Sequence, residues 1–134
     1  MADLSAVTAA DVAPVEIIEK FTGPAAESIT AGQYVRYNTT YGTIELGNAS
    51  TSGESRDGGI ALTSAATGIT LTALRKGIVD LGNIFADMAY DADVYLCSGD
   101  GLLASATQGV GKIVGEVVPV WGHTTADKCL RVDL

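Results

Sequence analysis

Short strand-like runs separated by glycine-centred turns recur along most of this chain and constrain its fold more than any other feature. The runs alternate apolar and polar residues, or are rich in branched and aromatic side chains, as half-buried strands are. They cover residues 33–39, 43–46, 59–62, 69–74, 77–81, 93–97, 101–104, 113–118 and 130–134. Many short strands at close spacing with glycine turns indicate a barrel or a sandwich. The sequence therefore predicts an all-β fold.

Local signals at two places sharpen this prediction. Residues 98–101 read Ser-Gly-Asp-Gly, and Asp-Gly favours a tight hairpin because the central residues of that turn need positive φ. Near the end of the chain, Leu130, Val132 and Leu134 alternate with polar residues, so we expect this face of the strand to be buried. Helix content is expected to be low, since 84–90 is the one stretch of the β region that could turn helically.

The first 28 residues differ from the rest, and we interpret them as an N-terminal arm or lead-in to a single β domain at 29–134. A short helix could start at Ser5, but the ring of Pro14 would end it early. The apolar cluster at residues 15–21 follows. Two interpretations of this cluster stay open: a first strand that completes the domain's own core, or an extended segment that lies on a neighbouring subunit.

The two halves of the β region show a weak internal echo. In both halves a valine, Val35 or Val94, precedes a turn glycine by seven residues, and similar apolar runs follow. A repeat of residues 31–74 and 90–134 would place two similar β units around one core.

Charge and cysteine content disfavour several classes of protein. Eight Lys and Arg against sixteen Asp and Glu give a net charge of −8. Phosphate binding needs clustered cations, so a nucleic-acid partner is disfavoured. We expect no membrane span, because no run of about 18 apolar residues occurs, and no secretory signal, because the first residues lack its pattern. Cys97 and Cys129 are therefore expected to be free thiols in a reducing cytoplasm.

No residue pattern predicts catalysis, a cofactor or a metal. Asp87, Asp91 and Asp93 form the densest carboxylate group, but the spacing of a calcium loop is missing, so we expect a solvated acidic turn. His123 has no second His or Cys at ligand spacing and would be the only base for Ser-His-Asp chemistry. The glycine-rich segment 53–59 lacks the lysine and the following helix of a phosphate cradle. We expect that the protein is not an enzyme.

Several short stretches follow one another in a characteristic order between residues 29 and 118. They are Ile29-Thr-Ala-Gly-Gln-Tyr-Val35 before a Gly42 turn, Gly59-Ile-Ala-Leu62, Gly68-x-Thr-x-Thr72, Gly77-Ile-Val-Asp-Leu-Gly82, Asp93-Val-Tyr-Leu-x-Ser98, Asp100-Gly-x-Leu-Ala104, and a late Gly115. In this order, over about two-thirds of the chain, the sequence resembles the capsid decoration (cement) proteins of tailed bacteriophages. The resemblance implies a small β-barrel or β-tulip-like domain.

The resemblance also implies a structural role. Proteins of this family dock on the outside of an icosahedral shell, typically as trimers, and clamp neighbouring capsid subunits against the pressure of packaged DNA. On this hypothesis the partner is the major capsid protein and the chain forms a homotrimer. It would lie on the virion exterior after synthesis in the host cytoplasm, with no nucleic-acid, membrane or small-molecule partner and no cofactor.

Candidate residues for contact with the capsid or a second subunit are Val15, Ile17, Ile18, Phe21 and Trp121. The first four belong to the N-terminal apolar cluster, which could add a strand to an edge of the capsid protein. Trp121 is the only Trp of the chain. It is interpreted either as a core residue or as an interface anchor.

Two alternative functions stay open. The chain could be another β module of a virion, such as a tail or fibre component. It could also be a carbohydrate-binding β domain, in which Tyr37 and Tyr41 share a surface, although the aromatic content of 6% speaks against a sugar binder.

Overall fold

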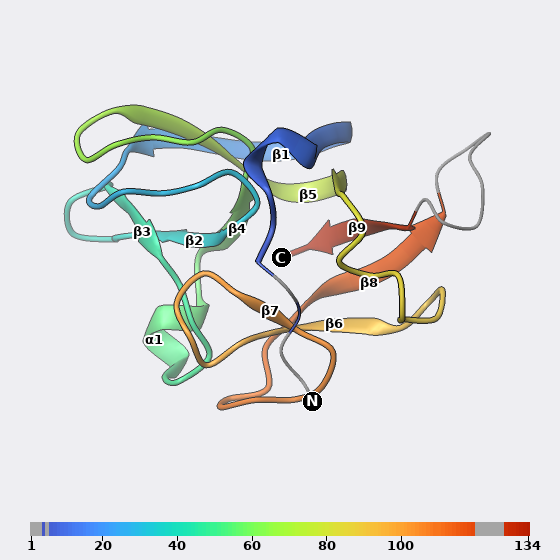
Figure 1. The fold of residues 1–134 in the computed structure, drawn as a ribbon. Coiled ribbons are helices and arrows are strands. Elements are labelled where there is room, and N and C mark those ends of the chain that lie inside the picture. The colour runs from blue at the N-terminus through green and yellow to red at the C-terminus, as the bar shows by residue number, and fades with distance from the viewer. Residues whose placement is uncertain (1–3, 5, 120–127) are drawn as a thin grey trace.

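The computed structural model describes residues 4, 6–119 and 128–134. They form a curled antiparallel sheet that resembles half of a barrel (Figure 1), so the predicted all-β, barrel-like fold is confirmed. The strands are β1 (Val12–Pro24), β2 (Tyr34–Tyr37), β3 (Ile44–Leu46), β4 (Gly58–Ala61), β5 (Thr70–Leu81), β6 (Asp93–Leu96), β7 (Leu103–Ala104), β8 (Ile113–Pro119) and β9 (Lys128–Asp133). A 3₁₀ helix, η1 (Ala9–Asp11), and a four-residue helix, α1 (Ser52–Ser55), complete the described elements. Neither of these two helices is long and apolar enough to span a membrane.

The strands follow the order β3-β2-β4-β5-β9-β8-β6-β7, and β1 pairs with β5 outside this path. The pairing order β3-β2-β4-β5 in the first half matches the order β7-β6-β8-β9 in the second, and an antiparallel β5–β9 pair joins them. The hairpin expected around residues 98–101 is present as the β6–β7 pair. The shared order concerns pairing alone, and a repeat of 31–74 and 90–134 at the level of the sequence stays a prediction.

The long strand β5 differs from the sequence prediction, which placed two separate strands at 69–74 and 77–81. The two runs form a single strand of twelve residues. The reason is Gly77, whose φ of 141° lies in a region that other residues rarely adopt, and where a Cβ would overlap the carbonyl oxygen of Glu16 on β1. Glycine in a strand permits a local irregularity and a close backbone approach, so the two predicted runs join into one strand.

Two clusters of buried side chains fill the inside of the curled sheet. The larger includes Tyr34, Leu74, Phe85, Val94, Leu130 and Val132, and the second includes Ile29, Val35, Ile44 and Leu71. The predicted alternation in the last strand is confirmed for Leu130 and Val132, which are buried, while Leu134 is half-buried and packs against the larger cluster. Phe85 and Met88 contribute to the core from a series of turns, so residues 84–90 pack inward without forming a helix.

The segment between β3 and β4 is partly buried. Tyr34 is completely buried, and its hydroxyl donates a 2.6 Å hydrogen bond to the backbone carbonyl of Ser55 in α1. Thr51 caps the start of this short helix by accepting a hydrogen bond from the backbone N–H of Glu54. Two glycines make room for the tyrosine ring, because a Cβ at Gly47 would lie 2.7 Å from ring carbons and one at Gly58 would overlap the hydroxyl.

The N-terminal residues lie against the chain's own domain. The backbone N–H of Leu4 donates to the carbonyl of Leu103, and Leu4 and Val7 pack against the larger core cluster. In Figure 1 this segment crosses the open side of the curled sheet from β1 towards β7. Strand β1 then pairs with β5 along its whole length. Where the structure describes it, the hypothesised arm at residues 1–28 is thus paired and packed within one chain, because β5 presents a full strand of backbone groups that a partner strand must satisfy.

Candidate docking surface

Strand β1 carries three of the eight large hydrophobic side chains that are exposed on the described surface. Val15, Ile17 and Ile18 are 48%, 46% and 68% exposed. They are exposed because β1 lies outside the main strand path and β5 is its one pairing partner among the described strands. Three exposed aliphatic side chains within four residues of one strand are a candidate interaction surface. We call these three residues the β1 apolar patch.

The fourth candidate on this strand, Phe21, points to a different role. It is half-buried and packs against the second core cluster. Its ring meets that of Tyr37 edge-on, with centroids 5.4 Å apart and planes at 75°. Phe21 therefore contributes to the domain's own packing, as the first-strand interpretation anticipated, whereas the β1 apolar patch remains open to a partner.

The backbone of β1 is poorly suited to strand addition over residues 14–20. One edge of β1 is paired with β5, and the register shifts between Pro14 and Glu16, between Ile17 and Glu19, and between Glu19 and Lys20. Proline lacks a backbone donor, and bulges twist an edge away from further pairing. A partner at this place is therefore expected to be held by side-chain packing, and the hypothesised addition of a capsid strand stays a prediction.

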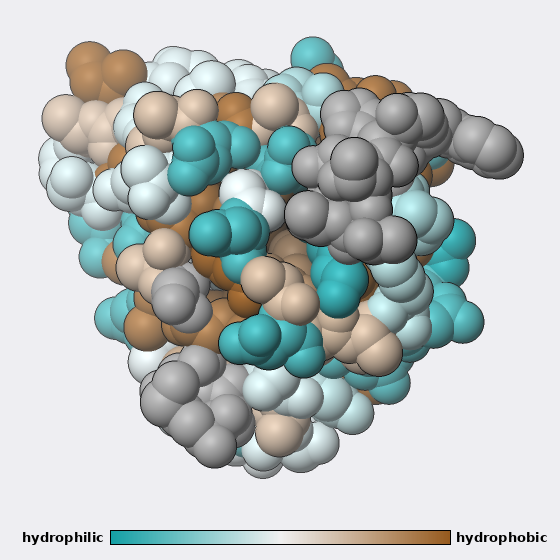
Figure 2. Space-filling model, turned by 45° about the vertical axis from the view of Figure 1, so that its right-hand side comes forward, coloured by the Kyte–Doolittle hydropathy of each residue, from teal (hydrophilic) through white to brown (hydrophobic). Residues whose placement is uncertain are grey.

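A polar face lies beside the β1 apolar patch, on the outer side of β5, β9 and β8. Ion pairs link Lys76 to Asp133 at 2.9 Å and Arg131 to Glu116. The hydrogen bond from Lys76 holds the pKa of the Asp133 carboxyl below its usual range. Both pairs bridge adjacent strands, since Lys76 is opposite Asp133 and Glu116 is opposite Arg131 in the sheet. In the space-filling view, hydrophilic and hydrophobic residues alternate over short distances across the surface (Figure 2).

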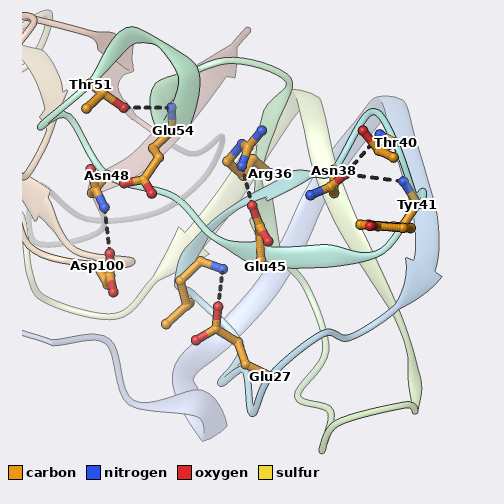
Figure 3. A network of polar contacts seen from close by, with 11 residues as sticks. Glu27, Arg36, Asn38, Thr40, Tyr41, Glu45, Asn48, Thr51, Glu54 and Asp100 are labelled. Atoms are coloured by element: carbon orange, nitrogen blue, oxygen red, sulfur yellow. Dashed lines mark hydrogen bonds and ion pairs between the residues drawn. The ribbon is translucent and has the colours of Figure 1, made fainter.

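A second set of polar contacts fixes the turns around β2 and β3 (Figure 3). Arg36 and Glu45 form an ion pair across these two strands. The side-chain oxygen of Asn38 accepts from the backbone N–H groups of Thr40 and Tyr41, which closes the turn between the strands. Asn48 donates to Asp100 at 2.6 Å and so joins two distant loops. The side chains of this set are bonded to other groups of the same domain, which indicates that they stabilise the fold.

The remaining candidate residues do not assemble into a reactive centre in the described part of the chain. Trp121 and His123 lie outside the described residues. No group of three or more His, Cys, Asp or Glu able to hold a metal occurs among the residues described, which include Asp87, Asp91 and Asp93. Cys97 and Cys129 are both buried.

The two tyrosines considered for sugar stacking differ in their exposure. Tyr41 is 78% exposed at the turn after β2. The ring of Tyr37 is half-buried and occupied by the edge-on contact with Phe21. The pair therefore does not present two free ring faces for a sugar.

The chain matches no family model, and no curated protein matches it either. Inference about its function therefore depends on the fold, on the surfaces described above and on the order of sequence stretches between residues 29 and 118.

Proposed function

We propose that this chain is a structural virion protein that binds the outer surface of an icosahedral phage capsid and cements neighbouring capsid subunits against the pressure of packaged DNA. The observation that carries the proposal is the β1 apolar patch, which is exposed on a domain whose other large aliphatic side chains are mostly in its core. The all-β, barrel-like fold is the coarse architecture that the resemblance to decoration proteins implies, and this agreement supports the same proposal.

The size of the patch indicates how such a protein would achieve tight binding. A fully exposed aliphatic side chain gains about 1.5–3 kcal/mol on burial, so three half-exposed ones contribute roughly 3 kcal/mol. Association costs about 4–15 kcal/mol in lost freedom of motion. One patch is therefore too weak alone, and a homotrimer that engages three sites at once would multiply the contacts without new chemistry. The proposed partner is the major capsid protein, and the proposed location is the virion exterior.

Binding to purified capsid shells tests this proposal. The variant Val15→Ser/Ile18→Ser removes the two side chains beside the β1 register shifts, and we expect it to fold normally because both are exposed. It should co-sediment with shells at least tenfold less tightly than the unchanged protein, since about 1.4 kcal/mol corresponds to a factor of ten.

Ile69→Ser is the matched control. Ile69 is 59% exposed but precedes the opposite end of β5, where Thr70 pairs with Pro24. The variant Ile69→Ser should leave shell binding unchanged. Equal binding by the unchanged protein and the double variant would show that the β1 apolar patch is not the docking site, and no binding by the unchanged protein would contradict the proposed function itself. Light scattering should give three times the mass of 13.7 kDa for the free protein.

A further inference from the structure

A straight row of charged side chains crosses the outer face of the sheet. Glu16 on β1 is opposite Ile78 on β5, Ile78 is opposite Arg131 on β9, Arg131 is opposite Glu116 on β8, and Glu116 is opposite Asp93 on β6. These five residues, the cross-strand row, contain three carboxylates and one guanidinium. Residues in register on neighbouring strands point to the same face, so the row has an excess of negative charge on one surface.

The charges of the row are unequally satisfied. Arg131 forms an ion pair with Glu116. Among the described residues, neither Glu16 nor Asp93 has an ion-pair partner. Asp93 also lies directly opposite Glu116, and like charges in that position destabilise a sheet. A cation bound near Asp93 would relieve this repulsion, and one near Glu16 would give that carboxylate a counter-charge.

The surface along the row is hollowed. One hollow of about 270 Å³ is lined by residues that include Glu16, Ile18 and Arg131. A second of about 250 Å³ is lined by residues that include Asp93, Ile113 and Arg131. Arg131 and Asp133 border both hollows. Each contains one carboxylate without an ion-pair partner and one exposed isoleucine, since Ile113 is 46% exposed and Ile18 belongs to the β1 apolar patch.

These observations define the chemistry of an occupant. Neighbouring strands lie about 4.8 Å apart, so the four intervals from β1 to β6 span roughly 19 Å, the length of about six extended residues. A second copy of this chain is disfavoured, because its net charge of −8 would be repelled by an acidic face. The carboxylates are spread along a groove, and no metal-binding group of three or more acidic, His or Cys residues occurs in the described part of the chain.

We propose that the cross-strand row is a docking groove for an extended segment of a partner protein about six residues long, with a basic residue near each end and apolar residues between them. If the proposed function holds, this segment belongs to the major capsid protein, and that part of the inference rests on the proposed function. The basic residues contact Glu16 and Asp93, and the apolar ones pack against Ile18 and Ile113.

A synthetic peptide tests the groove without any capsid. The probe is acetyl-Lys-Thr-Val-Val-Thr-Lys-amide, titrated into ¹⁵N-labelled protein and followed by backbone amide shifts. We expect shifts concentrated at β1, β9, β8 and β6. The variant Glu16→Gln/Asp93→Asn should weaken the peptide about three- to tenfold, the range for two exposed ion pairs. The variant Glu54→Gln/Asp87→Asn removes the same charge at exposed positions outside the row and should leave the affinity unchanged.

The peptide experiment and the shell experiment can contradict the groove and the proposed function separately. Absence of peptide shifts, or equal weakening by both double variants, would overturn the groove, since the attraction would then be general to an acidic protein. A peptide with glutamate in place of both lysines should not bind, and equal binding of that peptide would also overturn the inference. If the unchanged protein binds the lysine peptide at the row but no shells, the groove stands and the proposed function fails. If it binds shells while the peptide result is negative, the groove fails and the proposed function stands.

Discussion

Replacing Tyr34 with phenylalanine tests how the larger core cluster is linked to the segment that precedes β4. The tyrosine ring is completely buried, and the substitution keeps its shape. It removes the 2.6 Å hydrogen bond to the Ser55 carbonyl. Because Ser55 is only 4% exposed, that carbonyl would lose a partner that water cannot easily replace. An unsatisfied buried polar group costs about 1–3 kcal/mol, so we expect the free energy of unfolding to fall by about 2 kcal/mol.

Urea unfolding followed by circular dichroism measures this loss as a lower midpoint at an unchanged m-value. Tyr41→Phe is the matched control, since Tyr41 is largely exposed, and it should change stability by less than about 0.5 kcal/mol. A Tyr34→Phe midpoint equal to that of the unchanged protein would refute the reasoning, because the buried hydroxyl would then contribute nothing to the fold.

Three further predictions concern the same fold. Burial raises the pKa of Tyr34, so the folded state holds the phenol proton more tightly than the unfolded state. The stabilisation from this proton is complete below pH 10, and above pH 10 the free energy of unfolding falls by up to about 1.4 kcal/mol per pH unit. In urea titrations at pH 9 to 11, this fall should be smaller for Tyr34→Phe. Gly77→Ala forces a Cβ against the Glu16 carbonyl at a φ of 141°. We expect the free energy of unfolding to fall by about 2 kcal/mol or more, with faster amide hydrogen exchange in β1. Exchange at the native rate would contradict the bulge assignment. Deleting residues 131–134 removes the buried Val132 and the half-buried Leu134. This should lower the free energy of unfolding by about 3 kcal/mol or more, out of a total stability near 5–15 kcal/mol, and the melting temperature by more than 10 °C. Melting at the native temperature would show that β9 contributes little.

The sequence predicted the regular strands well because their signals are local. The hairpin at residues 98–101 follows from an Asp-Gly pair, and the buried face of β9 follows from the alternation of Leu130 and Val132. In both cases the residues that specify the structure are neighbours in the chain. The same reasoning missed that residues 69–74 and 77–81 form one strand, since a glycine that begins a new strand and one that permits a bulge look alike until the partner strand is known.

The candidate surface depended on information that the chain order does not contain. The sequence singled out the apolar cluster of β1, but it left open whether this cluster was core or surface. That choice depends on pairing with β5, which divides the cluster into a packed Phe21 and the exposed Val15, Ile17 and Ile18. The cross-strand row joins residues as distant as Glu16 and Arg131. The alignment of the whole row requires the register of four strand pairs, for which no local signal exists.

Cryo-electron microscopy of phage capsids, prepared with and without the protein, is the most direct test of the proposed function. We expect added density on the outer surface across junctions between capsid subunits, with β1 facing the shell. We also expect that decorated heads release their DNA at a higher temperature than bare ones. Heads that show no added density and are equally robust without the protein would contradict the proposed function.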